Sequence, residues 1–271
     1  FMKGTALSID ATTRKAAMLE VEQFPARQDN FGVLIHDPKS GETAAIDAPE
    51  LQPILDALER RGWTLTSLLI THWHPDHVEA NLDLKSRFNI RITGPEAEAT
   101  KIPGIDIMVK GGDAISFAGH RIDVIDTPGH TLGHVSFSIP SEKLLFSADT
   151  LFSLGCGRLL EGTPVQMWDS LQKLMKLPDD TIIYCGHEYT MANAKFALSI
   201  DPDNEVLVKR AIEVERLRAE GRPTLPVTIG AEKAANPFLR PSDGAIRERL
   251  GMEKATDAEV FAEIRKRKDN F

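Results

Sequence analysis

The chain has 271 residues, of which 42% are hydrophobic and 27% charged, as in a globular protein of one large domain or one domain with a smaller companion. Its formal net charge of −8 argues against broad nucleic-acid binding, and no apolar run reaches the roughly 18 residues that span a bilayer. The two cysteines, Cys156 and Cys185, are too few for a disulfide framework, so we expect a reduced, cytoplasmic setting.

The amino-terminal 17 residues are polar and contain no apolar core like that of a signal peptide. We interpret residues 1–17 as a leader or as residues added for expression, ahead of a start at Met18.

The next part of the chain alternates strands with helices. Apolar residues in alternation or in short runs predict strands over 18–24, 31–35 and 43–46. Leucines and isoleucines at helical spacing predict a helix over 50–61 that ends at Gly62. A short buried strand over 67–70 precedes a predicted helix over 76–88. The loop between them follows the carboxyl end of a strand, where ligands gather in open α/β sheets.

The predicted elements of the second half change near residues 188–192, from mostly strands to helices. Up to that point the pattern predicts short strands and one helix, over 114–117, 121–125, 135–139, 143–146, 163–177 (the helix) and 181–184. Beyond Tyr189 we expect no strands, a loop over the proline-rich 223–237, and helices over 205–218, 243–250 and 257–268. A small helical unit therefore follows an α/β unit.

The segment Thr71–His77, with the sequence THWHPDH, concentrates metal-binding side chains. Three histidines and one aspartate fall within six residues. His72 and His74 are two apart, so in an extended loop they point the same way and can share one metal. Asp76 and His77 begin the following helix and can reach a second metal beside the first. Imidazole and carboxylate together suit zinc, iron or manganese.

Three more candidate ligands follow predicted strands. They are His130 in DTPGHTLGH, Asp149 in FSADT and His187 in YCGHEYT. A lone histidine is more often a hydrogen-bonded residue than a ligand, but beside the first cluster we predict ligation for all three. For His134 we expect a supporting or packing role, and for Trp73 a place in the wall of the site or in the core.

The order of these motifs resembles the metallo-β-lactamase superfamily and, more narrowly, the glyoxalase II family of hydroxyacylglutathione hydrolases. The resemblance extends from about residue 19 to 271, and four further segments carry it, namely GCGR (155–158), EGT (161–163), NPF (236–238) and KDNF (268–271). It implies an α/β fold, a four-layer αββα sandwich with a C-terminal helical domain. The division would be a catalytic domain over 18–189 and a substrate-binding domain over 190–271.

The same resemblance implies a binuclear metal centre, with zinc the expected metal and iron or manganese also suited. Metal one would be held by His72, His74, His130 and Asp149. Metal two would be held by Asp76, His77, His187 and the bridging Asp149. Asp76 and Asp149 would act in catalysis through coordination, because two neighbouring cations can lower the pKa of a shared water and supply hydroxide at neutral pH.

The resemblance also implies a glutathione site made of Arg158, Tyr189, Arg265 and Lys268. Arg265 and Lys268 are three apart, so a helix presents them on one face. The chain departs from the family at two positions near this site. It has Leu160 where some members carry a tyrosine, and Trp73 where members often carry a histidine. Neither departure touches a predicted ligand, so both concern substrate affinity rather than the hydrolytic chemistry.

The function that follows is hydrolysis of S-D-lactoylglutathione and related 2-hydroxyacyl glutathione thioesters to glutathione and D-lactate, the second step of methylglyoxal detoxification, by a monomer. Alternatives on the same fold are a lactonase or β-lactamase-like hydrolase and a persulfide dioxygenase. A catalytically silent metal-binding protein is a further alternative. The complete ligand set argues against a silent protein, and a lactonase would not need the four glutathione-binding residues.

Overall fold

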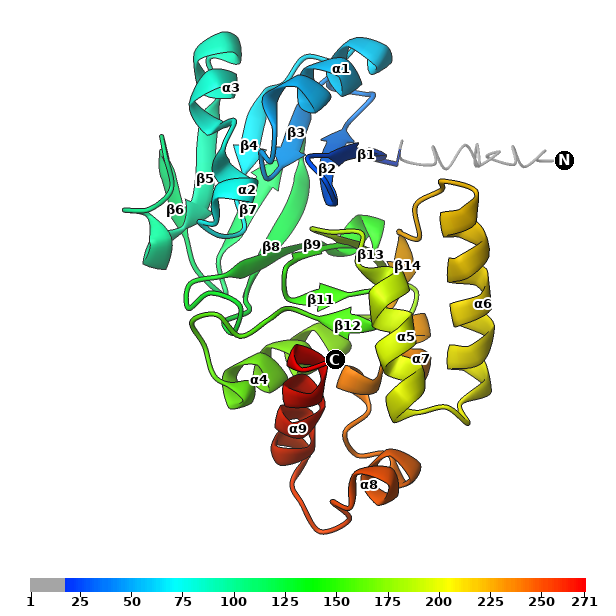
Figure 1. Ribbon diagram of the computed structural model, residues 1–271. Helices are drawn as coiled ribbons and strands as arrows, with labels where there is room; N and C mark the ends of the chain where they lie inside the picture. The colour runs from blue at the N-terminus through cyan, green and yellow to red at the C-terminus, as the bar shows by residue number, and fades with distance from the viewer. Residues whose placement is uncertain (1–17) are drawn as a thin grey trace, which may run out of the picture.

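Figure 1 shows the computed structural model, which describes residues 18–271. Two six-stranded sheets pack face to face, and helices cover the outer face of each, so the predicted four-layer αββα sandwich is confirmed. A C-terminal helical region follows, also as predicted. The interpretation of residues 1–17 as a leader lies outside the described residues.

The first sheet has its strands in chain order, the first three antiparallel and the rest parallel: β1 (Glu20–Ala26), β2 (Asn30–His36), β3 (Thr43–Ile46), β4 (Ser67–Leu69), β5 (Arg91–Pro95) and β6 (Ile107–Val109). Successive side chains of β2 point to opposite faces of the first sheet. Leu34 packs with α1 (Leu51–Arg61) and α3 (Asn81–Phe88), whereas Val33 and Ile35 face the second sheet. The short helices α2 (Pro75–Val78) and η1 (Glu96–Glu98) lie at the ends of strands.

The second sheet has the order β14 (Val227–Thr228), β13 (Ile182–Cys185), β10 (Leu144–Ala148), β9 (Val135–Ile139), β8 (His120–Asp126) and β7 (Ala114–Phe117). Only β10 and β13 are parallel neighbours, and η2 (Pro140–Glu142) connects β9 to β10. Leu144 and Phe146 of β10 point into the core between the sheets, whereas Leu145 points outward to the helices. This alternation produces two cores, one on each face of the sheet.

The helices of the outer core lie on both sides of residue 189 in the sequence. They are α4 (Pro164–Met175), α5 (Thr190–Ile200), α6 (Glu205–Ala219), α7 (Ile229–Ala235), η3 (Pro237–Leu239), α8 (Gly244–Leu250) and α9 (Asp257–Asp269). Trp168 of α4 stacks on Phe261 of α9 with ring centroids 5.9 Å apart. The last helix thus ends beside the small hairpin of β11 (Leu151–Phe152) and β12 (Gly155–Cys156) (Figure 1).

The structure corrects several predicted elements. Strands do not stop at Tyr189, because β14 pairs with β13, and the predicted loop over 223–237 contains β14 and α7. A two-residue strand shows no alternation that a sequence could reveal. The predicted helix over 76–88 is two helices, since the Ala80 amide donates to the Ala48 carbonyl at 3.0 Å instead of continuing the helical pattern. Strands β5 and β6 and helix α5 were not predicted.

Within residues 18–271, no helix is both long enough and apolar enough to cross a membrane.

Candidate metal centre and flanking cavities

All seven predicted ligands lie together where strands end. His72 and His74 lie in the loop after β4, and Asp76 and His77 begin the next helix, α2. His130 follows β8, Asp149 follows β10 and His187 follows β13. These strands belong to both sheets, so the site lies at the shared edge of the sandwich. The structure therefore brings together every residue that the sequence assigned to the centre.

Three imidazoles form the first ligand set. His74 Nδ1 lies 3.2 Å from His72 Nε2 and 3.0 Å from His130 Nε2. These three nitrogens all lie within 4.8 Å of one another, which suits a single cation between them.

Asp76, His77 and His187 form the second ligand set. Asp76 Oδ2 lies 3.5 Å from His77 Nε2 and 3.4 Å from His187 Nε2. Asn30 fixes this carboxylate, since its Nδ2 donates to Asp76 Oδ2 at 3.0 Å. The mixed oxygen and nitrogen donors again suit zinc, iron or manganese.

Asp149 lies between the two sets. Its Oδ2 is 3.3 Å from Nε2 of His130, in the first set, and 3.3 Å from Nε2 of His187, in the second. Burial alone would raise the pKa of this carboxyl, but the imidazoles of His77 and His187 hold it well below its usual range. The side chain is therefore an ionised carboxylate placed where it can contact two cations.

In four of the five ligand histidines, all except His74, a polar group contacts Nδ1 and leaves Nε2 directed at the centre. His72 Nδ1 contacts Thr71 Oγ1 at 3.0 Å, and His130 Nδ1 contacts the Arg158 carbonyl at 2.8 Å. His77 and His187 are held by carboxylates instead, at 2.8 Å from Asp47 Oδ2 and 2.9 Å from Asp29 Oδ1 respectively. Such partners fix the ring orientation and make the imidazole a better ligand.

Asp47 and Asp29 were missed by the sequence reasoning. Asp47 lies close enough to His72 and His77 to resemble a ligand. However, it also accepts hydrogen bonds from the Thr71 amide at 2.7 Å and the Thr71 hydroxyl at 2.8 Å, so both of its oxygens are engaged away from the centre. Its signal in the sequence was its place directly after β3, next to β4 in the sheet.

Two buried polar atoms indicate that the centre fits metal. Within residues 18–271, His77 Nε2 and Asp149 Oδ1 are among the few buried side-chain atoms that lack a hydrogen-bond partner. A buried polar atom without a partner costs about 1–3 kcal/mol, and coordination would remove that cost. The imidazole and carboxylate donors are those of a divalent-metal site.

Two glutamates hold the ligand loops together. The Glu98 carboxylate accepts from the Trp73 amide at 2.8 Å and from the Gly133 amide at 3.0 Å. Glu161 accepts from Trp73 Nε1 at 3.0 Å and from the Leu132 amide at 2.9 Å. Trp73 packs against the core outside the first sheet and lies edge-on to His74, with ring centroids 4.8 Å apart. Both glutamates connect the loop before α2 to the loop after β8.

His134 supports Asp149 rather than facing the ligand sets. Its Nε2 lies 3.3 Å from the Asp149 amide, and its Nδ1 lies 2.8 Å from Thr127 Oγ1. This agrees with the supporting role expected from its sequence position.

The first of two cavities beside the centre, here named the Arg265 cavity, has a volume of about 360 Å³. Its walls include His130 and Asp149 of the centre and the four residues that the sequence assigned to glutathione, Arg158, Tyr189, Arg265 and Lys268.

The three cationic side chains of the Arg265 cavity differ in how buried they are and in whether their donors are already hydrogen-bonded. Arg265 is buried and already engaged, since Nη1 donates to the Cys156 carbonyl at 2.9 Å and Nη2 to Asp269 at 2.8 Å. Arg158 is exposed, with its side chain 71% accessible. Lys268 is half-buried, and burial together with the charge of Arg265 lowers the pKa of its ammonium.

Buried polar groups hold the hairpin behind this cavity. The Glu232 carboxylate accepts from the Ser153 hydroxyl at 3.1 Å and the Leu154 amide at 2.8 Å. Asn236, the first residue of the NPF segment, donates to Glu232 and to the Gly155 carbonyl, each at 3.0 Å. Burial raises the pKa of Glu232 from 4.5 to about 7. The GCGR and NPF segments are thus parts of one hydrogen-bonded unit.

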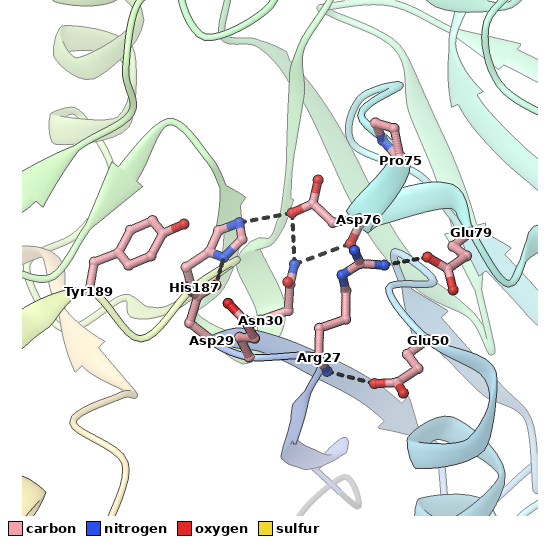
Figure 2. Close-up of a pocket in the computed structure, with 10 residues that line it drawn as sticks. Arg27, Asp29, Asn30, Glu50, Pro75, Asp76, Glu79, His187 and Tyr189 are labelled. Carbon is pink, nitrogen blue, oxygen red and sulfur yellow. Dashed lines mark hydrogen bonds and ion pairs between the residues drawn. The ribbon is translucent and has the colours of Figure 1, made fainter.

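The second cavity, named the Arg27 cavity, has a volume of about 620 Å³ and borders Asp76 and His187 (Figure 2). Its other walls include Arg27, Asp29, Glu50 and Glu79, while Tyr189 borders both cavities. Tyr189 stacks on His187 with ring centroids 4.7 Å apart. No motif in the sequence pointed to this cavity, because four separate segments form it.

Comparison with known proteins agrees with these observations. The sequence model of the hydroxyacylglutathione hydrolase C-terminus matches residues 188–271, and that of the metallo-beta-lactamase superfamily matches residues 32–187. The hydroxyacylglutathione hydrolase of Rhizobium meliloti (strain 1021) is 64% identical over 255 residues, which cover 94% of this chain and 100% of the relative. This chain belongs to the hydroxyacylglutathione hydrolase family. The resemblance drawn from the motifs is therefore confirmed.

A further relative supports the same placement, and solved structures share the fold. The enzyme of Mesorhizobium japonicum is 64% identical over 93% of this chain and 99% of its own length. Among solved structures, ETHE1 from Myxococcus xanthus matches with a TM-score of 0.66 and 25% identity, over 91% of this chain and 90% of that one. The BLEG-1 B3 metallo-beta-lactamase matches with a TM-score of 0.63 and 22% identity, over 82% of this chain and 100% of that one, which concerns the fold alone.

Proposed function

We propose that this protein hydrolyses S-D-lactoylglutathione and related 2-hydroxyacyl glutathione thioesters to glutathione and D-lactate or the corresponding acid, in methylglyoxal detoxification. The observation that carries the proposal is the position of a cationic cavity directly beside the convergent ligand groups. The family relatives that are 64% identical bear the name hydroxyacylglutathione hydrolase, which favours hydrolysis over persulfide oxidation.

The centre would hold two divalent cations, with zinc the first choice. His72, His74 and His130 would bind one, Asp76, His77 and His187 the other, and Asp149 both. Cations held there would supply Lewis acidity, which activates water and polarises a carbonyl. Asp76 and Asp149 would then serve as ligands rather than as bases.

The Arg265 cavity would take the glutathione part of the substrate. Glutathione bears two carboxylates and one ammonium, so its capture needs cations beside the centre. Arg158 and Lys268 are the cations with accessible donors, and charge-assisted hydrogen bonds from them would hold the carboxylates. Arg265, turned inward to Cys156 and Asp269, would shape the cavity wall, and Tyr189 would border the scissile bond.

No acid is needed for the leaving group. The thiol of a glutathione thioester has a pKa of about 8.5, so the thiolate leaves without protonation near neutral pH. Accordingly, the residues assigned above are metal-ligand candidates and substrate-binding residues, and none is assigned the role of a general acid.

Other features of the chain fit this activity. All ligands and both cavities come from a single chain, which supports a monomer acting alone. The residues 18–189 would form the catalytic unit and 190–271 the substrate-binding unit. Cys156 and Cys185 are both buried and free, which suits a reducing cytoplasm.

A steady-state assay with S-D-lactoylglutathione, on protein of measured metal content, tests the proposal. We expect turnover that rises with bound metal up to about two equivalents and disappears after chelation. A chain that carries two metals and leaves this thioester intact, while opening a lactone or a β-lactam, would overturn it.

A further inference from the structure

The Arg27 cavity borders the second ligand set and has no role in the glutathione site described above. It reaches Asp76 and His187, whereas the Arg265 cavity reaches His130 and Asp149. Tyr189 borders both. A thioester whose sulfur side lies in the Arg265 cavity and whose carbonyl lies at the centre would therefore direct its acyl group towards the Arg27 cavity or into solvent.

We propose that the Arg27 cavity is the acyl-group subsite and that the Arg27–Glu79 ion pair makes it select neutral, hydroxyl-bearing acyl groups over acyl groups that carry a carboxylate. The inference rests on the proposed thioesterase activity and names the acyl class that this activity would accept.

The walls of the cavity are polar. Beside the ligand candidates they present Arg27, Gln28, Asp29, Asn30, Glu50 and Glu79. Pro75 and the ring of Tyr189 are the main apolar surfaces. Such walls can hydrogen-bond a short hydroxylated group, whereas an aliphatic chain would remove polar groups from water without replacing their hydrogen bonds.

Arg27 is held over the cavity by its own backbone and by two carboxylates. It lies in the turn between β1 and β2 with φ of 50°, in the left-handed region that non-glycine residues seldom adopt. Its amide donates to Glu50 Oε2 at 2.6 Å, and its Nη1 pairs with Glu79. Figure 2 shows the side chain extending from the turn towards Glu79, on the side of the cavity that carries Asp76.

The charges of the cavity oppose a second carboxylate. Asp29, Glu50 and Glu79 are anionic and Arg27 is the cation among the lining residues, even before Asp76 is counted. Because Glu79 already pairs with Arg27, an acyl carboxylate would have to displace it. A hydroxyl group carries no charge and avoids this competition.

The test compares two glutathione thioesters, the D-lactoyl and the succinyl, on metal-loaded protein. In the wild type we expect kcat/KM for the lactoyl thioester to exceed that for the succinyl thioester by about tenfold or more, as a lost charge-assisted hydrogen bond implies. Glu79→Gln should free Arg27 and raise the succinyl-to-lactoyl ratio by about tenfold. Glu79 is 56% accessible in its side chain, so this change leaves the fold intact.

Two further variants complete the test. Arg27→Met should cancel the gain when combined with Glu79→Gln, because the freed cation is then absent. Glu22→Gln is the matched control, since it removes a carboxylate of β1 that is also paired with an arginine, Arg60, but lies away from the cavity. It should leave the substrate ratio unchanged.

The outcomes separate this inference from the proposed function. A wild type that hydrolyses lactoylglutathione, with a substrate ratio that Glu79→Gln does not move, overturns the acyl subsite alone. A metal-loaded wild type that hydrolyses neither thioester overturns the proposed function, and the subsite with it. A shift of the ratio in Glu22→Gln as large as that in Glu79→Gln would also contradict the subsite.

Discussion

The two cavities beside the metal centre differ in charge. Apart from the candidate ligands Asp149 and Asp76, the Arg265 cavity presents three cations against Asp269, whereas the Arg27 cavity presents one arginine against three carboxylates. The protein is acidic overall, so the cationic cavity is a local feature that the net charge of −8 conceals. Both cavities border the same centre, and their difference would orient the glutathione part, with its two carboxylates and one ammonium, on one side and a neutral acyl group on the other.

The residues that would carry out hydrolysis are therefore distinct from those that would select the substrate. The ligand sets surround Asp149 and depend on groups that point inward, such as Asp47 and Asp29. The charges that distinguish the cavities lie on other segments, chiefly α9 and the β1–β2 turn. The substrate could therefore change without any change at the centre.

Asp149→Ala gives the largest expected effect, because this carboxylate lies between the two ligand sets that both cavities border. We expect a loss of about a thousandfold or more in kcat/KM for every thioester, and bound metal of one equivalent or less. Metal analysis alongside kinetics measures both. Full activity in this variant would show that the centre is not the common element of the two cavities.

Glu232→Gln tests whether the Glu232 carboxyl, buried behind the Arg265 cavity, makes stability depend on pH. The pKa of Glu232 lies near 7 in the folded protein, above the ordinary 4.5, so the folded state binds an extra proton between these values. Its contribution to stability is complete below pH 4.5 and is lost as the pH rises to 7, by about 3 kcal/mol. Urea unfolding at pH 5 and pH 8 should show this loss in the wild type relative to the variant. Identical pH dependence in both proteins would contradict the assignment.

Lys268→Met should act on one cavity only. We expect KM for a glutathione thioester to rise about tenfold or more while kcat stays within about twofold, because a charge-assisted contact to the substrate is lost. A neutral lactoyl thioester of N-acetylcysteamine should be unaffected. Lys266→Met is the matched control, since Lys266 is exposed on the same helix and outside the cavity. Equal effects from the two lysines would remove Lys268 from the site.

Ionic strength should give the smallest effect. Raising salt shortens the screening length from about 10 Å at 0.1 M to about 3 Å at 1 M. We expect KM for the glutathione thioester to rise a few-fold over this range, and KM for the neutral thioester to stay constant. A salt-independent KM for both would mean that the cationic cavity does not attract the substrate.

The sequence predicted the centre well because its ligands are scarce residue types. The chain has eight histidines, and five of them lie in the two ligand sets, each in a loop that follows a strand or, for His77, in the first turn of the helix after that loop. Residue type and strand position together were enough to place them. The pattern of strands and helices predicted an α/β unit followed by a helical unit, and the four-layer sandwich was predicted from the family resemblance.

What the sequence could not predict depends on tertiary contacts. Asp47 is a single carboxylate after a strand, and nothing in its spacing tells an orienting group from an ordinary turn residue. The basic run at 265–268 does not reveal that Arg265 turns inward to Cys156. The Arg27 cavity needs four segments to meet, and β14 is too short for a pattern.

The pairing of β14 with β13 has a consequence for how the carboxyl-terminal region can be separated from the rest. β13 ends two residues before His187, and its outer edge is covered by a strand from residues 227–228. A chain cut after residue 189 would leave that edge and the apolar groups of α4 uncovered, which favours aggregation. The carboxyl-terminal region that would recognise the substrate therefore also supplies an edge strand to the sheet that positions a ligand, and neither part should be stable without the other.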